Sequence, residues 1–160
     1  MAEQKSSGSP FTVMALTFIV AIAAGVGYYQ FFYLPELSAK PQVPEEILNP
    51  LKVAEVSIIQ GSFNQDQPDN FIPKRLEVQL GLNNKVIWTN EDSAPHTVTT
   101  DDGYTDPWSG LFDSREHTET PLIMPGETFE FLFTEPGEYH YHCEPHPWMT
   151  GTVVVEELKF

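Results

Sequence analysis

The stretch from Thr128 to Cys143, TFEFLFTEPGEYHYHC, limits what this chain can fold into more than any other feature of its sequence. Its apolar and polar side chains alternate, so that the three phenylalanines share one face and the glutamate between them lies on the other. The pair Pro136-Gly137 interrupts the alternation and marks a turn. Two β-strands joined by a turn, each with one face toward a core, are therefore predicted here.

The same kind of pattern recurs along most of the chain after residue 52. Short segments rich in Val, Ile, Thr and aromatic residues are separated by Gly, Pro, Asn and Asp, without a convincing helical period. With 160 residues in the chain, this succession predicts one all-β sandwich domain that begins near Val53. The predicted strands are Val53–Gln60, Arg75–Leu80, Lys85–Asn90, His96–Thr100, Thr128–Thr134, Glu138–Cys143 and Gly151–Glu156.

An uncharged apolar segment precedes this domain. The run from Phe11 to Leu34, FTVMALTFIVAIAAGVGYYQFFYL, is long enough as a helix, at about 1.5 Å per residue, to cross a hydrocarbon layer of roughly 30 Å. Its C-terminal end is rich in Tyr and Phe, which favour the boundary between membrane and water. We therefore expect residues 1–34 to be a single N-terminal transmembrane anchor. The alternative is a cleaved signal peptide with Ala21-Ile22-Ala23 as the cleavage site.

Residues 35–52 connect the apolar segment to the predicted domain. They are rich in proline and glutamate, which is typical of an extended, semi-stiff tether. Lys5 and the α-amino group lie before the apolar segment, whereas acidic residues predominate after it. The positive-inside rule then favours an N-terminus inside the membrane and a domain outside it, periplasmic or pseudo-periplasmic. The predicted organisation is an anchor at 1–34, a tether at 35–52 and a β-sandwich domain at 53–160.

The charge of the chain restricts its partners. The formal net charge is −15, and the whole excess lies beyond the apolar segment, because Glu3 and Lys5 cancel each other before it. This charge argues against binding to nucleic acid or to an anionic lipid surface through a basic face. A solvated acidic surface is the simplest interpretation. Such a surface would attract a partner with a basic docking face, in a salt-dependent manner.

The single cysteine of the chain, Cys143, lies within the sequence YHYHCEPHPWM. It cannot form a disulfide within the chain, so its presence calls for another role. The alternation predicts that it lies on the inner side of a strand end together with the two tyrosines before it, while the two interleaved histidines face outward. A thiol at the end of a strand, next to a histidine-containing loop, is a candidate metal ligand, although a lone cysteine can also be a small buried apolar residue.

His146 and Met149 follow Cys143 at intervals of three residues, in a loop that the two prolines beside His146 stiffen. A thiolate, an imidazole and a thioether are soft donors, and they select copper over magnesium, calcium or manganese. The best candidate for a fourth ligand is His96, at the start of a predicted strand. Two histidines, one cysteine and a weak axial methionine are the ligands of a mononuclear blue-copper electron-transfer site. Met149 could instead be a core residue, with the axial position open or filled by a backbone oxygen.

These motifs resemble those of the cupredoxins, the type 1 blue copper proteins, and in particular amicyanin and plastocyanin. GEYHYHCEPHPWMTGTVVV is similar to the amicyanin ligand loop, VIWTNEDSAPHTV resembles the strand with the first histidine ligand, and MPGETFEFLFTEPGEY resembles the strand pair that leads to the cysteine. The resemblance covers Val53 to Glu156. It implies an eight-stranded Greek-key sandwich with one copper ion, cycling between Cu(I) and Cu(II), at one end.

The resemblance also implies a role for each ligand candidate. His96, Cys143 and His146 would be the equatorial ligands, and Met149 the axial one. The ring edge of His146 would reach the surface and serve as the exit for the electron. Thr97 is a departure, because these small blue proteins commonly have asparagine after the first histidine. This departure leaves open how the hydrogen bonds near the ligand loop are made.

Together these features predict a membrane-anchored copper protein that shuttles single electrons between respiratory redox partners on the outer membrane face, and that is not an enzyme. Its expected partners are other redox proteins or membrane respiratory complexes, and membership of a larger complex is left open.

Copper storage or delivery is one alternative. A copper oxidoreductase similar to nitrite reductase is another, suggested by His142 directly before Cys143. Such an enzyme would need further histidines for a second copper site. Apart from the proposed ligands and His142, the chain has only His117, expected at the surface, and His140. Met124 is expected in the core.

Overall fold

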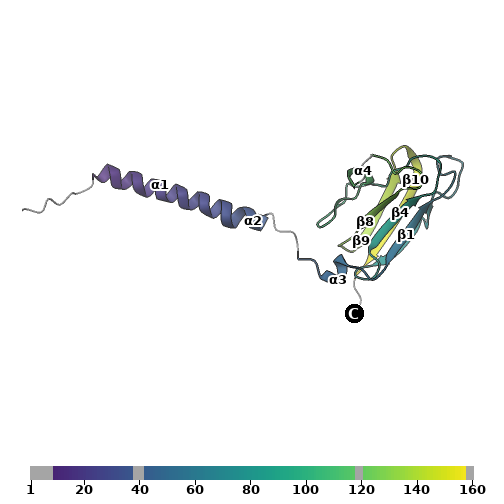
Figure 1. The fold of residues 1–160 in the computed structure, drawn as a ribbon, viewed down its shortest axis with the longest axis horizontal. Coiled ribbons are helices and arrows are strands. Elements are labelled where there is room, and N and C mark those ends of the chain that lie inside the picture. The colour runs from purple at the N-terminus through teal and green to yellow at the C-terminus, as the bar shows by residue number, and fades with distance from the viewer. Residues whose placement is uncertain (1–8, 38–41, 118–120, 158–160) are drawn as a thin grey trace, which may run out of the picture. The chain divides into compact units, whose positions relative to one another are not determined.

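The structure is a computed structural model, and it describes residues 9–37, 42–117 and 121–157 (Figure 1). The chain divides into two compact units, Met1–Lys40 and Pro41–Phe160. The predicted boundaries at residues 34 and 52 stay predictions, and positions 38–41 of the predicted tether lie outside the described residues.

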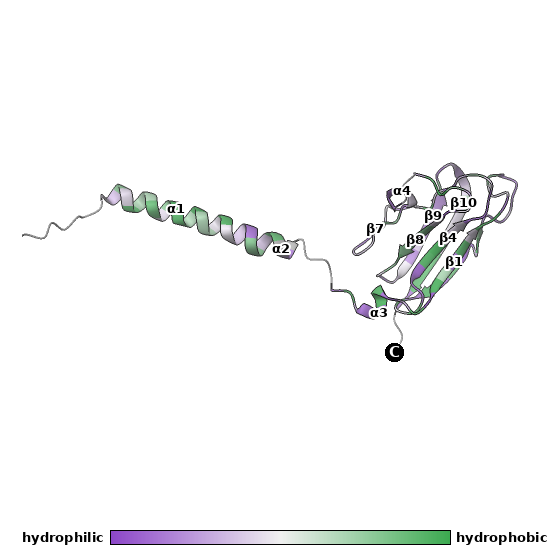
Figure 2. Cartoon of the chain, in the orientation of Figure 1, coloured by the Kyte–Doolittle hydropathy of each residue, from purple (hydrophilic) through white to green (hydrophobic). Residues whose placement is uncertain are grey.

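The first unit is a helical run of apolar residues. It consists of α1 (Pro10–Tyr28), the π-helix η1 (Tyr29–Tyr33) and α2 (Leu34–Leu37). Pro10 occupies the first turn, where its missing N–H leaves no hydrogen bond unmade. The run Pro10–Tyr33 is long and apolar enough to cross a membrane, and Figure 2 shows mainly hydrophobic residues along it. A membrane anchor and a signal sequence both have this form.

The second unit is a β-sandwich of two four-stranded sheets. In one sheet the strands lie in the order β2-β1-β4-β8, and in the other β3-β10-β9-β5. The pairs β1/β4 and β3/β10 are parallel, and the remaining pairs are antiparallel. The strands of these sheets are β1 (Val53–Ile58), β2 (Phe71–Ile72), β3 (Arg75–Gln79), β4 (Lys85–Asn90), β5 (Thr99–Thr100), β8 (Thr128–Leu132), β9 (Gly137–Cys143) and β10 (His146–Glu156). The all-β sandwich prediction is confirmed.

The chain between β5 and β8 makes an excursion from the two sheets. It contains the short hairpin of β6 (Thr105–Asp106) and β7 (Gly110–Leu111), followed by α4 (Ser114–His117). The buried carboxylate of Asp106 accepts hydrogen bonds that fasten the hairpin to the end of β8. Its donors are the backbone N–H groups of Trp108, Ser109 and Thr134, the hydroxyl of Thr134 and the hydroxyl of Tyr104.

Aromatic side chains fill the space between the sheets. The Trp88 ring of β4 lies with its centroid 5.4 Å from that of Phe129 in β8 and 5.6 Å from that of Tyr141 in β9, so it joins the two sheets. Phe112, from the excursion, packs against the same cluster. Each large aromatic side chain removed from water contributes about 2 to 3 kcal/mol to folding, and such a core holds the strand ends in fixed positions.

Two strands begin at residues other than the predicted ones. Only Thr99–Thr100 of the predicted strand 96–100 is a strand, because His96 makes an isolated bridge with Ile123 instead of joining the sheet. The last strand begins at His146, five residues before the predicted start at Gly151, with an irregularity between His146 and Thr150.

Met124, expected in the core, is 40% exposed in the turn that ends at Glu127, so that expectation was wrong.

Part of the predicted tether lies against the sandwich. The short helix α3 (Glu45–Leu48) buries Ile47 in the core, and the side-chain amide of Asn84 donates to the carbonyl oxygens of both Ile47 and Phe133. Lys52 donates its backbone N–H to Leu82. The chain from Ile47 onward is therefore fixed to the domain by burial and hydrogen bonds.

Candidate metal centre

Three segments bring the predicted ligands to one place. Cys143 ends β9 and His146 begins β10, and the two residues face each other across the antiparallel pair. His96 comes from a separate segment, where its backbone N–H and C=O both bond to Ile123. The alternation in β9 buries Tyr139, Tyr141 and Cys143, as predicted, and leaves the residues between them more exposed.

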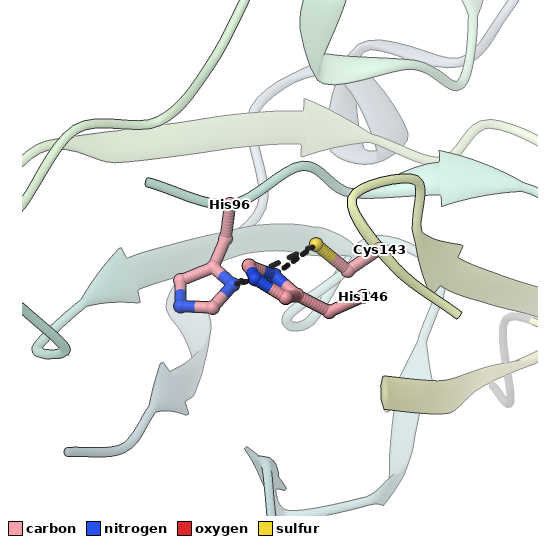
Figure 3. A group of neighbouring side chains, drawn as sticks. All are labelled: His96, Cys143 and His146. Atoms are coloured by element: carbon pink, nitrogen blue, oxygen red, sulfur yellow. Dashed lines mark hydrogen bonds between the residues drawn. The ribbon is translucent and has the colours of Figure 1, made fainter. Parts of the chain in front are cut away.

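The donor atoms of His96, Cys143 and His146 form a close group (Figure 3). The Sγ atom of Cys143 lies 3.6 Å from His96 Nδ1 and 3.5 Å from His146 Nδ1, and the two Nδ1 atoms are 3.1 Å apart. In Figure 3 the two rings and the sulfur converge on one point between them. His96 and Cys143 are fully buried and His146 is half-buried, so the group opens toward solvent on the His146 side.

The orientation of His96 is set by a carboxylate on its far side. His96 Nε2 lies 2.9 Å from Asp92 Oδ2, and both side chains are completely buried. Burial alone would raise the pKa of Asp92, but hydrogen bonds from the backbone of Gly61 and from His96 outweigh it and lower the pKa to about 2. Asp92 is therefore ionised at neutral pH and can only accept, so Nε2 of His96 carries the hydrogen. His96 Nδ1 then presents its lone pair to Cys143 and His146.

Thr97 holds the cysteine from two sides. Its backbone N–H donates to Cys143 Sγ at 3.3 Å, and its hydroxyl oxygen accepts the backbone N–H of Glu144 at 2.9 Å. Thr97 thus makes the side-chain bond to the ligand loop even though asparagine, the more common residue at this position of the small blue proteins, is missing. Burial raises the pKa of the Cys143 thiol, and the hydrogen bond from Thr97 opposes that rise only in part.

His146 and Met149 complete the loop. Burial lowers the pKa of His146, as it does the pKa of His96, so both imidazoles are neutral and can act as ligands at neutral pH. The Trp148 ring lies with its centroid 5.3 Å from that of His146, and its Nε1–H donates to the carbonyl oxygen of Ser62 at 3.2 Å. Met149 is completely buried and lies near the three donors.

The donor set fits a copper ion. In a trigonal plane, bonds of about 2.0 Å to nitrogen and about 2.3 Å to sulfur, the lengths found for zinc, hold the donors roughly 3.5 to 3.7 Å apart. The two separations from Cys143 Sγ match this spacing, and the separation between the two Nδ1 atoms is slightly shorter. Two neutral imidazoles and one thiol with a buried thioether nearby are soft donors of the kind that copper prefers.

The other histidines lie outside this group in the part of the chain that the structure describes. His142 faces outward, where its Nδ1 lies 2.5 Å from Asp101 Oδ1. His140 Nδ1 lies 3.0 Å from the Thr152 hydroxyl, and His117 is exposed with Nε2 2.7 Å from the Leu111 carbonyl oxygen. Asp92 was not among the predicted site residues, although its position four residues before His96 is a usable signal.

The sandwich and the two-histidine, one-cysteine group together define a cupredoxin. A family model described as copper binding proteins, plastocyanin/azurin family, matches residues 62–156. The chain belongs to this family. The predicted class is therefore confirmed: a copper-binding cupredoxin similar to amicyanin and plastocyanin, which are themselves electron carriers and not enzymes.

Individual relatives agree with this assignment. Amicyanin-alpha of Methylorubrum extorquens is 36% identical over 80 residues, which are 50% of this chain and 60% of the relative. Amicyanin of Paracoccus denitrificans is 31% identical over 121 residues, 75% of this chain and 82% of the relative. The solved structure of a novel purple cupredoxin from Nitrosopumilus maritimus has a TM-score of 0.51 at 30% identity and covers 64% of this chain and 99% of its own. The match thus spans about three fifths of the first relative's length.

Proposed function

We propose that this protein is a single-electron carrier in which His96, Cys143 and His146 are the equatorial ligands of one copper ion and Met149 is its axial ligand. The observation that carries the proposal is the convergence of Nδ1, Nδ1 and Sγ on one point at the end of a sandwich. Copper supplies the one-electron couple between Cu(I) and Cu(II). Family membership supports both the metal and the reaction type.

The surrounding protein favours fast transfer by holding its ligands still. His96 is fixed by Asp92 and by the bridge to Ile123, and Cys143 is fixed by Thr97 and by the β9/β10 pair. Ligands held in one geometry need little rearrangement when the charge of the ion changes, which lowers the barrier to electron transfer. A copper storage or delivery protein would instead gain from ligands that exchange easily.

His146 is the proposed exit for the electron. His96, Cys143 and Met149 are completely buried, whereas the His146 ring is half-buried beside Trp148. A partner can therefore approach the site most closely over His146. The net charge of −15 favours a redox partner with a basic docking face, and association should weaken as salt rises.

We further propose that residues 1–34 anchor the domain 53–160 through the tether 35–52 at the outer face of a membrane, with the N-terminus inside, between respiratory redox proteins. The apolar run Pro10–Tyr33 supports an anchor by its length and composition. Confinement by a short tether raises the effective concentration of neighbouring partners. Intact-mass measurement of the protein from membranes tests this point: a mass that includes residues 1–34 supports the anchor, and loss of the segment near Ala23 shows a signal peptide.

Redox cycling of the copper-loaded full chain separates the carrier from its alternatives. A carrier should be reduced and reoxidised repeatedly by small one-electron reagents, with one copper retained per chain after dialysis against a Cu(I) chelator. Loss of copper in the reduced state would point to storage or delivery. Steady turnover of nitrite by the loaded protein would point to a copper oxidoreductase and would contradict the carrier proposal.

A further inference from the structure

Asp92 is a buried carboxylate surrounded by hydrogen-bond donors. It is 2% exposed as a whole residue, and its side chain is completely buried. Both oxygens are occupied, and the donors come from three separate places in the chain. Oδ1 accepts from Ser93 N at 2.7 Å, Gly61 N at 2.9 Å and Gln60 Nε2 at 3.2 Å, and Oδ2 accepts from Phe63 N at 3.0 Å and from His96 Nε2 at 2.9 Å.

The loop Gln60–Phe63 follows β1 and connects to both ligand-bearing segments. On one side, its backbone N–H groups at Gly61 and Phe63 bond to Asp92, which in turn bonds to His96. On the other side, the carbonyl oxygen of Ser62 accepts the Nε1–H of Trp148, from the segment between His146 and Met149. One short loop therefore links the isolated ligand His96 with the ligand loop after Cys143.

We propose that Asp92 is a positioning residue for the copper site. It holds the His96 ring with Nδ1 directed at Cys143 and His146, and it fastens the Gln60–Phe63 loop that also holds Trp148. The inference rests on the proposed function in so far as His96 binds copper. Carboxylates behind metal-bound histidines fix the orientation and tautomer of the ring, and removing such partners typically lowers metal affinity by about 10- to 100-fold.

An amide cannot replace this carboxylate. Asparagine has one acceptor oxygen and one NH₂ group, whereas both oxygens of Asp92 face N–H donors. In Asp92→Asn one of the two sets of donors must therefore face the NH₂ group. If the NH₂ group faces His96, the Nε2–H tautomer loses its acceptor. If it faces Gly61 and Ser93, these two N–H groups lose their acceptor, and the loop keeps only the bond from Phe63.

The proposal can be tested first without copper. The ¹⁵N chemical shifts of the His96 imidazole in the apo form of the full chain identify which ring nitrogen carries the hydrogen. The expected result is the Nε2–H tautomer in the wild-type protein. A dominant Nδ1–H tautomer in wild-type apoprotein would overturn the proposal, and this outcome depends neither on copper binding nor on the folding of any variant.

Asp106→Asn provides a matched control for Asp92→Asn. Asp106 is 1% exposed and is also saturated by hydrogen-bond donors, but its partners have no residue in common with those of Asp92. Both variants should lose stability. Only Asp92→Asn should change the copper site, by losing either the single His96 tautomer or the bonds from Gly61 and Ser93, and it should lower copper affinity by about 10- to 100-fold and change the copper hyperfine splitting. If the two variants have the same His96 tautomer, the same copper affinity and the same hyperfine splitting, the proposal is overturned.

The copper measurements also separate this inference from the proposed function. If wild-type protein binds no copper in a thiolate site, the proposed function fails, while the tautomer still tests the positioning of His96. If wild-type protein binds copper and Asp92→Asn binds it equally tightly with an unchanged hyperfine splitting, the inference fails and the proposed function stands.

Discussion

The backbone N–H of Thr97 donates to the sulfur of Cys143 at 3.3 Å, and the hydroxyl oxygen of the same Thr97 accepts the N–H of Glu144, the residue after the cysteine, at 2.9 Å. One residue thus holds both the ligand atom and the start of the ligand loop. The two bonds come from different parts of Thr97, one from its backbone and one from its side chain, so mutation can separate them.

Thr97→Val should weaken the loop without removing the bond to the sulfur. Valine has nearly the same shape but lacks the acceptor, so the N–H of Glu144 and the hydroxyl of Thr99 each lose a partner, and the part-buried Glu144 bond alone should cost about 0.5 to 1.5 kcal/mol. Thermal unfolding of the apoprotein measures this loss. Thr97→Asn, which supplies a side-chain acceptor again, is the control and should recover most of it. Equal stability of the valine variant and the wild-type protein would show that the Glu144 bond contributes nothing.

Pro145→Ala should raise the reduction potential. Proline has no N–H, so alanine at this position offers a new donor close to Cys143 Sγ, in addition to the N–H of Thr97. A donor to the sulfur withdraws electron density from the thiolate and favours Cu(I). Redox titration of the loaded variant gives the answer, with Pro125→Ala, in a turn at the protein surface, as the control. An unchanged or lower potential in Pro145→Ala would contradict this explanation.

Copper affinity should increase with pH above neutrality. Burial lowers the pKa values of His96 and His146, so both rings are already neutral above about pH 6.5. Burial raises the pKa of the Cys143 thiol, so the thiol is still protonated there and must lose its proton to bind the metal. Affinity should therefore rise about tenfold per pH unit between roughly pH 7 and 8.5.

Competition with a chelator of known affinity, with its own protonation taken into account, measures this slope. Release of one proton per copper bound at pH 7.5, detected in weakly buffered solution, is an independent check. A flat profile over this range would mean that Cys143 is already ionised in the apoprotein, or that the thiolate is not a ligand.

Gly151→Ala should destabilise the sheet next to the site. A Cβ atom at this position would lie 2.3 Å from the ring carbon Cζ of Tyr141 and 2.4 Å from its hydroxyl oxygen. Tyr141 is completely buried, so the ring has little room to move away. Overpacking of this kind costs about 1 to 3 kcal/mol. Chemical denaturation of the apoprotein should show a lower midpoint, and an unchanged midpoint would mean that the Tyr141 ring moves freely.

Much of the sandwich could be predicted from the sequence because several of its longer strands, such as β1, β4, β8 and β9, alternate between buried and more exposed residues. Strand β4 has the predicted bounds Lys85–Asn90, and in β9 the buried positions, including Cys143, are the predicted ones. The two-residue strands β2, β6 and β7 were not predicted, because alternation cannot be recognised over so short a segment. Strand β2 pairs with β1, whereas β6 and β7 pair with each other in a short hairpin.

The candidate ligands were accessible to the sequence analysis because three of them lie within one short motif. What the sequence could not provide is the surroundings of His96. Its bridge to Ile123 and its contact with Asp92 arise from tertiary packing, and they explain why the predicted strand at 96–100 begins only at Thr99. The role of Thr97 also became clear only when β9 and the His96 segment were seen side by side.

The most direct test of the copper site is a visible and electron-spin-resonance spectrum of the full chain in detergent after addition of one equivalent of Cu(II), repeated with Cys143→Ser. The account predicts an intense thiolate-to-copper absorption band and a narrow copper hyperfine splitting in the wild-type protein, both absent from the variant. A colourless product, or a tetragonal copper signal that is the same in both proteins, would contradict it.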